Sequence, residues 1–232
     1  MRITQRTLAE VAACAYHGDG GSPPEGYHFV DKQVKISDTC FSTYINEVNK
    51  TAILAVRGSY SLHELKQSVA AGFDKITSGS ARSIQTEVQK IWEEYLERFI
   101  SLRSPEYEFY VSGHSYGGMI AQALAGEHNI KGASFNAPGI GKLTCPYPEV
   151  EFYNHIMASD LLSSVVNRSD HLGKKIIHKP AKCSSKGVFK RFEHKIRTHI
   201  VDPQKGTSHS LEYLLKHHFE KSCEDATDSC HC

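Results

Sequence analysis

The segment 111–118, which reads Val-Ser-Gly-His-Ser-Tyr-Gly-Gly, constrains the fold more than any other part of the chain. It contains the pattern Gly-x-Ser-x-Gly with Ser115 at its centre. The preceding residues 106–112 have the composition of a strand, and the Ala-rich residues 116–126 that of a helix. On such a strand-turn-helix, the serine is held in a strained backbone conformation with its side chain projecting from the sheet edge. The segment therefore predicts an α/β fold and makes Ser115 a candidate nucleophile.

The residues around Ser115 fit this interpretation. Two glycines, Gly113 and Gly117, stand where the chain comes too close to the serine for side chains, and Gly118 follows. The helix that starts after Ser115 would direct its positive dipole end, and the amide of Tyr116, at a developing oxyanion. The pattern favours a catalytic serine over an incidental serine in a Gly-rich turn.

The rest of the chain alternates between predicted strands and helices, which favours a mostly parallel central sheet with helices on both faces. This is the architecture of the α/β-hydrolase fold. We expect helices over 4–16, 62–71, 81–102 and 208–219. We expect strands over 27–36, 40–48, 51–56, 106–112, 131–135 and 151–157. Residues 1–222 are predicted to form one domain, and 223–232 a Cys-containing tail.

Composition excludes several functional classes. The chain has 232 residues, 40% of them apolar and 23% charged, which is ordinary for a globular protein. Its net charge of +1 gives no basic field that would attract nucleic acid. There is no run of 18 apolar residues for a transmembrane segment, and the first ten residues lack the apolar stretch of a signal peptide. A soluble protein, cytoplasmic by default, is expected, and export without a signal peptide stays open.

The seven cysteines are odd in number and irregularly spaced, which favours reduced thiols over a disulfide framework. Cys230-His231-Cys232 lacks the spacing of a zinc site, so a solvated tail is the preferred interpretation. We expect neither a metal nor an organic cofactor.

A nucleophilic serine needs a histidine base and an acid that orients it, and in this fold the chain order is Ser, acid, His. Asp160 lies just past the predicted strand 151–157, at the sheet edge that carries the sites of parallel sheets. Asp170 is the alternative acid. His209, which opens the last predicted helix, is the preferred base, and His199 is the second choice.

Five segments together resemble the lipase class 3 family, the fungal-type triacylglycerol lipases and their bacterial phospholipase-like relatives. They are Ala-Val-Arg-Gly-Ser at 55–59, Gly-His-Ser-Tyr-Gly-Gly at 113–118, Ser-Phe-Asn-Ala-Pro-Gly at 134–139, Ala-Ser-Asp-Leu-Leu at 158–162 and Ser-His-Ser-Leu-Glu-Tyr at 208–213. The resemblance spans nearly the whole chain. It implies that Ser59 and Tyr116 donate their amides to an oxyanion hole, and that Ser115, Asp160 and His209 form the triad.

The chain also departs from this family. Tyr116 replaces the usual Leu, the acid segment lacks the Pro often found after the Asp, and 72–82 is polar and small, unlike an apolar lid. The resemblance implies an ester hydrolase acting on lipid through an acyl-enzyme, with transient contact at a membrane surface. A phospholipase, lysophospholipase or soluble esterase is at least as well supported as a lipase on emulsified fat. An inactive binding module on the same fold, an acyltransferase, or an amide hydrolase with the same triad remain alternatives.

Overall fold

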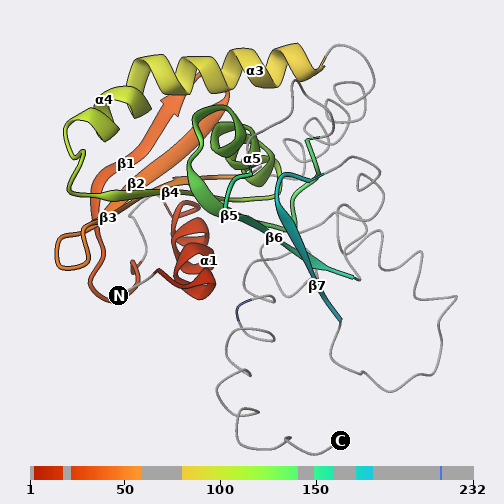
Figure 1. Ribbon diagram of the computed structural model, residues 1–232, viewed down its shortest axis with the longest axis horizontal. Helices are drawn as coiled ribbons and strands as arrows, with labels where there is room; N and C mark the ends of the chain where they lie inside the picture. The colour runs from red at the N-terminus through yellow and green to blue at the C-terminus, as the bar shows by residue number, and fades with distance from the viewer. Residues whose placement is uncertain are drawn as a thin grey trace, which may run out of the picture.

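The computed structural model describes residues 3–17, 22–58, 80–140, 149–158, 171–179 and 215 of the chain. They form a seven-stranded sheet whose strands follow one another in sequence order, β1-β2-β3-β4-β5-β6-β7 (Figure 1). The first three strands pair antiparallel, and β3 to β7 pair parallel. The strands are β1 (His28–Ile36), β2 (Thr39–Asn46), β3 (Thr51–Val56), β4 (Glu108–His114), β5 (Lys131–Phe135), β6 (Phe152–Met157) and β7 (Lys174–His178).

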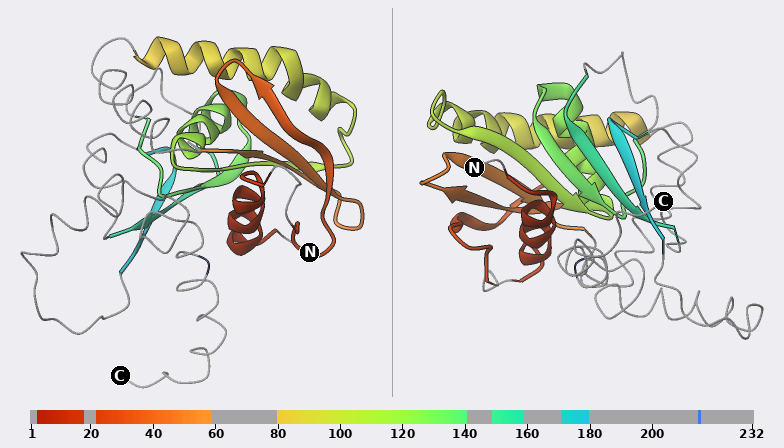
Figure 2. Two further views of the ribbon diagram at one scale, coloured as in Figure 1. Left: turned by 180° about the vertical axis from the view of Figure 1, so that it is seen from behind. Right: turned by 60° about the horizontal axis from the view of Figure 1, so that its bottom comes forward.

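Helices cover both faces of this sheet. The helix α1 (Gln5–Cys14) lies on one face, and α3 (Ser80–Ile91), the π-helix η2 (Trp92–Leu96), α4 (Glu97–Ser101) and α5 (Tyr116–His128) lie on the other (Figures 1 and 2). Because β3, β4 and β5 are parallel, the chain must cross back over the sheet between each pair. The helical segment from α3 to α4 lies in the crossing from β3 to β4, and α5 makes the crossing from β4 to β5. The predicted α/β architecture, with a mostly parallel sheet between helices, is confirmed.

Each face of the sheet has its own apolar core. The core beneath α3 and α5 includes Phe41, Leu54, Val111 and Ile120, and the core beneath α1 includes Leu8, Tyr44, Ile53 and Phe135. All six residues of β3 are buried, as the continuous apolar sequence predicts. The helix α5 is buried along most of its length, since its alanines and glycines allow it to lie close to the sheet.

The single α-helix predicted over 81–102 is wrong in its middle. The chain is α-helical from Ser80 to Ile91, widens to a π-helix over Trp92–Leu96, and continues as α4 to Ser101. At this π-helix, Trp92 stacks on His128 of α5 at 3.6 Å between ring centroids, and Tyr95 donates a hydrogen bond to Asp31 of β1. Periodicity did not reveal the extra residue, because π-turns interrupt the 3.6-residue repeat only locally.

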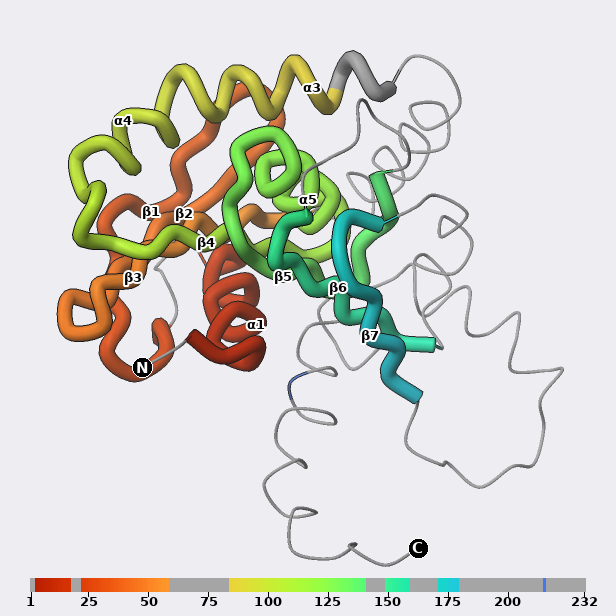
Figure 3. The backbone as a smooth tube through the Cα atoms, viewed as in Figure 1, coloured from red at the N-terminus to blue at the C-terminus, as the bar shows by residue number. Residues whose placement is uncertain are grey.

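The strand β7 forms one edge of the sheet and was not predicted from the sequence (Figure 3). Its sequence, Lys-Lys-Ile-Ile-His, is too short and polar to match a buried strand, but lysines are typical of an edge strand. Gly173, with a φ of 70°, turns the chain into this strand. The expected helices over 62–71 and 208–219 lie outside the described residues, apart from Leu215, which packs against the core beneath α1. No helix within the described part of the chain is long and apolar enough to cross a membrane.

A buried histidine connects β6 to the sheet edge. The Nδ1 atom of His155 lies 2.9 Å from Nε2 of His178, and its Nε2 lies 3.3 Å from Oε1 of Gln5 in α1. The His155 ring also stacks on Phe135. Burial, and then the proximity of His178, lowers the pKa of His155 to about 3. The folded protein therefore holds this imidazole neutral at a pH where the unfolded chain would protonate it.

The free energy of unfolding is expected to fall with acidification because of His155. In the unfolded chain its pKa is about 6.5, so between about pH 6.5 and pH 3 the unfolded state binds a proton that the folded state does not. This one group should lower the stability by about 1.4 kcal/mol per pH unit over that window. Urea unfolding from pH 7 to pH 4.5 measures the slope. His155→Gln should flatten this slope relative to wild type. An unchanged slope in His155→Gln would contradict this assignment.

Candidate active site

Ser115 stands in a strained backbone conformation between β4 and α5. Its φ of 54° and ψ of −127° lie outside the regions that non-glycine residues ordinarily occupy. Hydrogen bonds hold it there: its N–H donates to the carbonyl of Phe135 at 3.0 Å, and its carbonyl accepts from the N–H groups of Gly118 and Met119. These bonds tie the serine to the neighbouring strand and to the first turn of α5. The strand-turn-helix predicted around Ser115 is confirmed.

The two glycines of the motif are required by space. A Cβ atom on Gly113 would lie 2.5 Å from the carbonyl carbon of Gly117, and one on Gly117 would lie 2.7 Å from the carbonyl carbon of Arg57. Real Cβ atoms essentially never come this close to other atoms, so a side chain at either position would push α5 away from β3 and β4. The turn at Ser115 is therefore closely packed against the end of β3.

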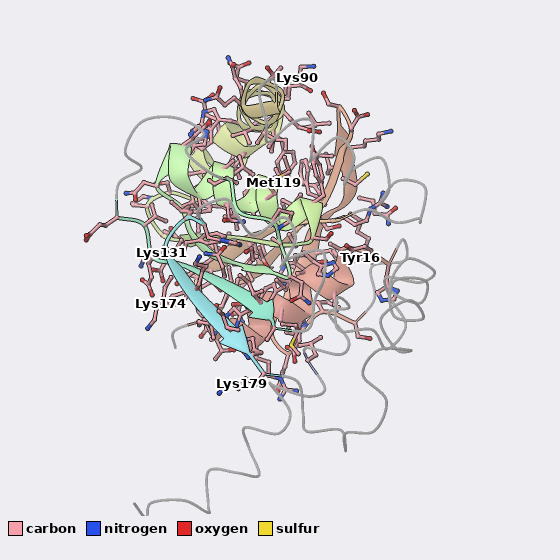
Figure 4. The ribbon with its side chains drawn as sticks, turned by 90° about the vertical axis from the view of Figure 1, so that its right-hand side faces the viewer. Tyr16, Lys90, Met119, Lys131, Lys174 and Lys179 are labelled. Atoms are coloured by element: carbon pink, nitrogen blue, oxygen red, sulfur yellow. The ribbon has the colours of Figure 1, made fainter. Side chains whose placement is uncertain are left out.

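On the α1 side, Tyr16 and His114 support the turn. The Tyr16 hydroxyl lies 2.8 Å from Nδ1 of His114, the residue before Ser115, and both side chains are buried. Figure 4 labels Tyr16 beside α1. A Cβ on Gly58 would meet the Tyr16 hydroxyl, the carbonyl oxygen of His114 at 2.6 Å and the Cβ of Ser115 at 3.1 Å. The chain just after β3 thus lies directly against the candidate nucleophile.

On the opposite side of the sheet, Tyr116 is bound to α3. Its hydroxyl donates a hydrogen bond of 2.9 Å to Oε2 of Glu87, and Thr39 donates one of 2.5 Å to Oε1 of the same carboxylate. Burial, followed by the negative charge of Glu87, raises the pKa of Tyr116 far above its ordinary value. The phenol therefore stays protonated and remains a hydrogen-bond donor.

Asn136 joins β5 to β6 near the same edge of the sheet. It has a φ of 46°, its N–H donates to the carbonyl of His155, and its Oδ1 accepts from the N–H of Met157 at 2.9 Å. Since Asn136 is fully buried, these bonds fix the end of β6 firmly. The strand β6 ends at Met157, three positions before Asp160 in the sequence.

The structure places two of the five predicted site residues, Ser115 and Tyr116, next to one another at the carboxyl end of β4. The other three, Ser59, Asp160 and His209, lie outside the described residues, as do the alternatives Asp170 and His199. Tyr16 and Glu87 were missed. Both contact the motif across long stretches of sequence, and neither stands in a pattern that would have marked it.

Two cysteines lie in the described part of the chain. Cys14 and Cys40 are free thiols there. Burial, and then the charge of Glu10, raises the pKa of Cys14 to about 11, so its thiol stays protonated near neutral pH.

Comparison with known proteins identifies the fold. Lip2 lipase from Yarrowia lipolytica is similar to this chain with a TM-score of 0.53 and 14% sequence identity, covering 75% of this chain and 77% of that one. A mutant of MDLA from Penicillium cyclopium has a TM-score of 0.56 and 16% identity, covering 79% of this chain and 82% of that one. Lipase II from Rhizopus niveus has a TM-score of 0.53 and 18% identity, covering 77% of this chain and 83% of that one.

No family model and no curated protein sequence matches the chain. At these identities the structural likeness establishes the fold. The chain has the α/β-hydrolase fold of fungal-type lipases, as the resemblance in sequence implied.

Proposed function

We propose that this protein is a serine-dependent carboxylic ester hydrolase that acts on lipid, with Ser115 as the nucleophile. The observation that carries the proposal is the backbone of Ser115, whose φ of 54° and ψ of −127° are held by hydrogen bonds between β4 and α5. A protein retains such strain where the surrounding structure enforces it, and strained residues cluster at active sites. The closely packed end of β3 and the similarity of the fold to fungal lipases support the same proposal.

The proposed reaction is a two-step acyl transfer. The base, His209, removes the proton from the Ser115 hydroxyl, whose oxygen attacks the ester carbonyl carbon. The amides of Ser59 and Tyr116 stabilise the oxyanion, and one such donor typically contributes about 10²–10³ in rate. The alcohol leaves with the proton from His209, and a water molecule activated by the same imidazole then releases the acid. Asp160 orients the imidazole and stabilises its charge.

The substrate class follows from the fold neighbours and the departures in sequence. Proteins named as lipases share the fold, which favours a lipid ester. The polar segment 72–82 differs from an apolar lid, so we place phospholipids and lysophospholipids beside neutral glycerides as candidate substrates.

The first test combines labelling with a substrate panel. The full chain is treated with a fluorophosphonate probe, and the labelled peptide is identified by mass spectrometry. It is also assayed with p-nitrophenyl esters of increasing chain length and with a phospholipid dispersion, beside Ser115→Ala as the background. Labelling at Ser115 with serine-dependent release of long acyl chains is expected. Release from short esters alone would indicate a soluble esterase. Absence of both labelling and release would refute the hydrolase and favour a binding module.

A further inference from the structure

A buried carboxylate accepts a hydrogen bond from the side chain of Tyr116, the residue that follows Ser115. Glu87 is 7% exposed, and both hydrogen bonds that the structure gives its carboxylate come from neutral hydroxyl groups, those of Thr39 and Tyr116. Burying a polar group is costly, and an apolar side chain could fill the same space without that cost. Packing alone therefore does not account for Glu87.

The three residues come from three separate elements. Thr39 is the first residue of β2, Glu87 lies in α3, and Tyr116 is the first residue of α5. Lys90 of the same α3 donates a hydrogen bond of 3.2 Å to Ser37, in the turn before β2. Figure 4 shows Lys90 on this outer helix and Met119 of α5 nearer the sheet. The carboxylate thus connects the sheet and both helices to the residue that follows Ser115.

We propose that Glu87 and Thr39 are positioning residues that orient the backbone amide of Tyr116 toward the oxyanion, by holding the Tyr116 ring at its hydroxyl. This inference rests on the proposed function. As the first residue of α5, Tyr116 has an N–H with no acceptor inside the helix. Relaxation of the strained Ser115 backbone would rotate the Ser115–Tyr116 peptide and turn this N–H away. A Tyr116 ring held at its hydroxyl opposes that rotation. The Leu that the lipase class 3 family usually has at this position has no hydroxyl and cannot be held in this way.

The variants Tyr116→Phe and Glu87→Gln test the proposal. Tyr116→Phe removes only the hydroxyl, so the main-chain amide stays but its orientation is no longer fixed. We expect kcat for the best ester to fall about ten- to hundredfold with KM within about twofold, because displacement of a catalytic group by about 1 Å costs up to about 10² in rate. The rate at which Ser115 displaces fluoride from a fluorophosphonate should fall in parallel. The double variant Tyr116→Phe/Glu87→Gln should be no slower than Tyr116→Phe alone, since both substitutions act on the same hydrogen bond between the two side chains.

The chain offers a control in a second cluster, in which a tyrosine hydroxyl contacts a carboxylate and a threonine. Tyr95 donates to Asp31 at 2.6 Å, and its hydroxyl lies 2.7 Å from Oγ1 of Thr43. Tyr95→Phe should lose a comparable amount of stability against urea and keep wild-type kcat. A purely structural role for Glu87 predicts that both Tyr→Phe variants behave alike.

The outcomes separate two failures. The wild type could be labelled and active while Tyr116→Phe is equally active or changes only in KM. That result would overturn the positioning role alone. A wild type that is neither labelled at Ser115 nor active on any ester would overturn the proposed function, and the positioning role with it.

Discussion

Asp160→Asn is expected to lower kcat for ester hydrolysis by about 10⁴, because the amide leaves the imidazole in the wrong tautomer while the site keeps its shape. Asp170→Asn should keep kcat near that of wild type. The two residues are ten positions apart, and only Asp160 closely follows β6, which ends at Met157. In a parallel sheet the functional residues gather at the carboxyl ends of the strands, so the acid is expected directly after β6.

Asn136 fixes the end of β6, the strand that precedes Asp160 in the sequence. Its side chain accepts a hydrogen bond from the Met157 amide and holds the end of β6 against β5, the strand beside Ser115. The measurement is steady-state hydrolysis of the best p-nitrophenyl ester, with Ser115→Ala setting the background and urea unfolding confirming that each variant is folded. Full activity in Asp160→Asn together with a severe loss in Asp170→Asn would reverse the assignment.

The parts of the fold that sequence predicted are those set by local patterns. The six residues of β3 form a continuous apolar run because both faces of that strand are buried, and the limits predicted from the run match the structure. The turn at Ser115 was predictable because its glycines are required by contacts of the turn with itself and with the end of β3.

Other features depend on contacts between distant residues and leave no local pattern. The hydrogen bond from Tyr116 to Glu87 joins residues 29 positions apart, and that from Thr39 to Glu87 joins residues 48 apart. In the sequence, Glu87 is one glutamate among the polar residues of an amphipathic helix, and nothing there distinguishes it from an exposed one. The strand β7 was missed for a related reason, since an edge strand needs little apolar sequence when its partner β6 supplies the pairing.

Gly117→Ala is expected to abolish most of the activity through the backbone alone, without removing any functional group. The added methyl would lie 2.7 Å from the carbonyl carbon and oxygen of Arg57 and still closer to the carbonyl oxygen of Val56. Backbone atoms at the end of a central strand cannot yield as a flexible side chain would, so the first turn of α5 must move. Overpacking of this kind costs about 1–3 kcal/mol of stability. A shift of about 1 Å at Ser115 would lower kcat about 10²-fold.

Gly132→Ala separates the loss of stability from the loss of geometry. Gly132 of β5 pairs with Val111, and a methyl there would lie 3.0 Å from the carbonyl carbon of Val111 and closer to its oxygen, again against backbone. The Gly132 clash lies in the same sheet, but it falls on Val111 of β4, four positions before Ser115. Urea unfolding should therefore show comparable destabilisation in the two variants, while kcat and the rate of fluorophosphonate labelling fall much further in Gly117→Ala. Equal losses of kcat in both would mean that the activity follows global stability, and that the close packing of α5 against β3 has no separate role in placing the nucleophile.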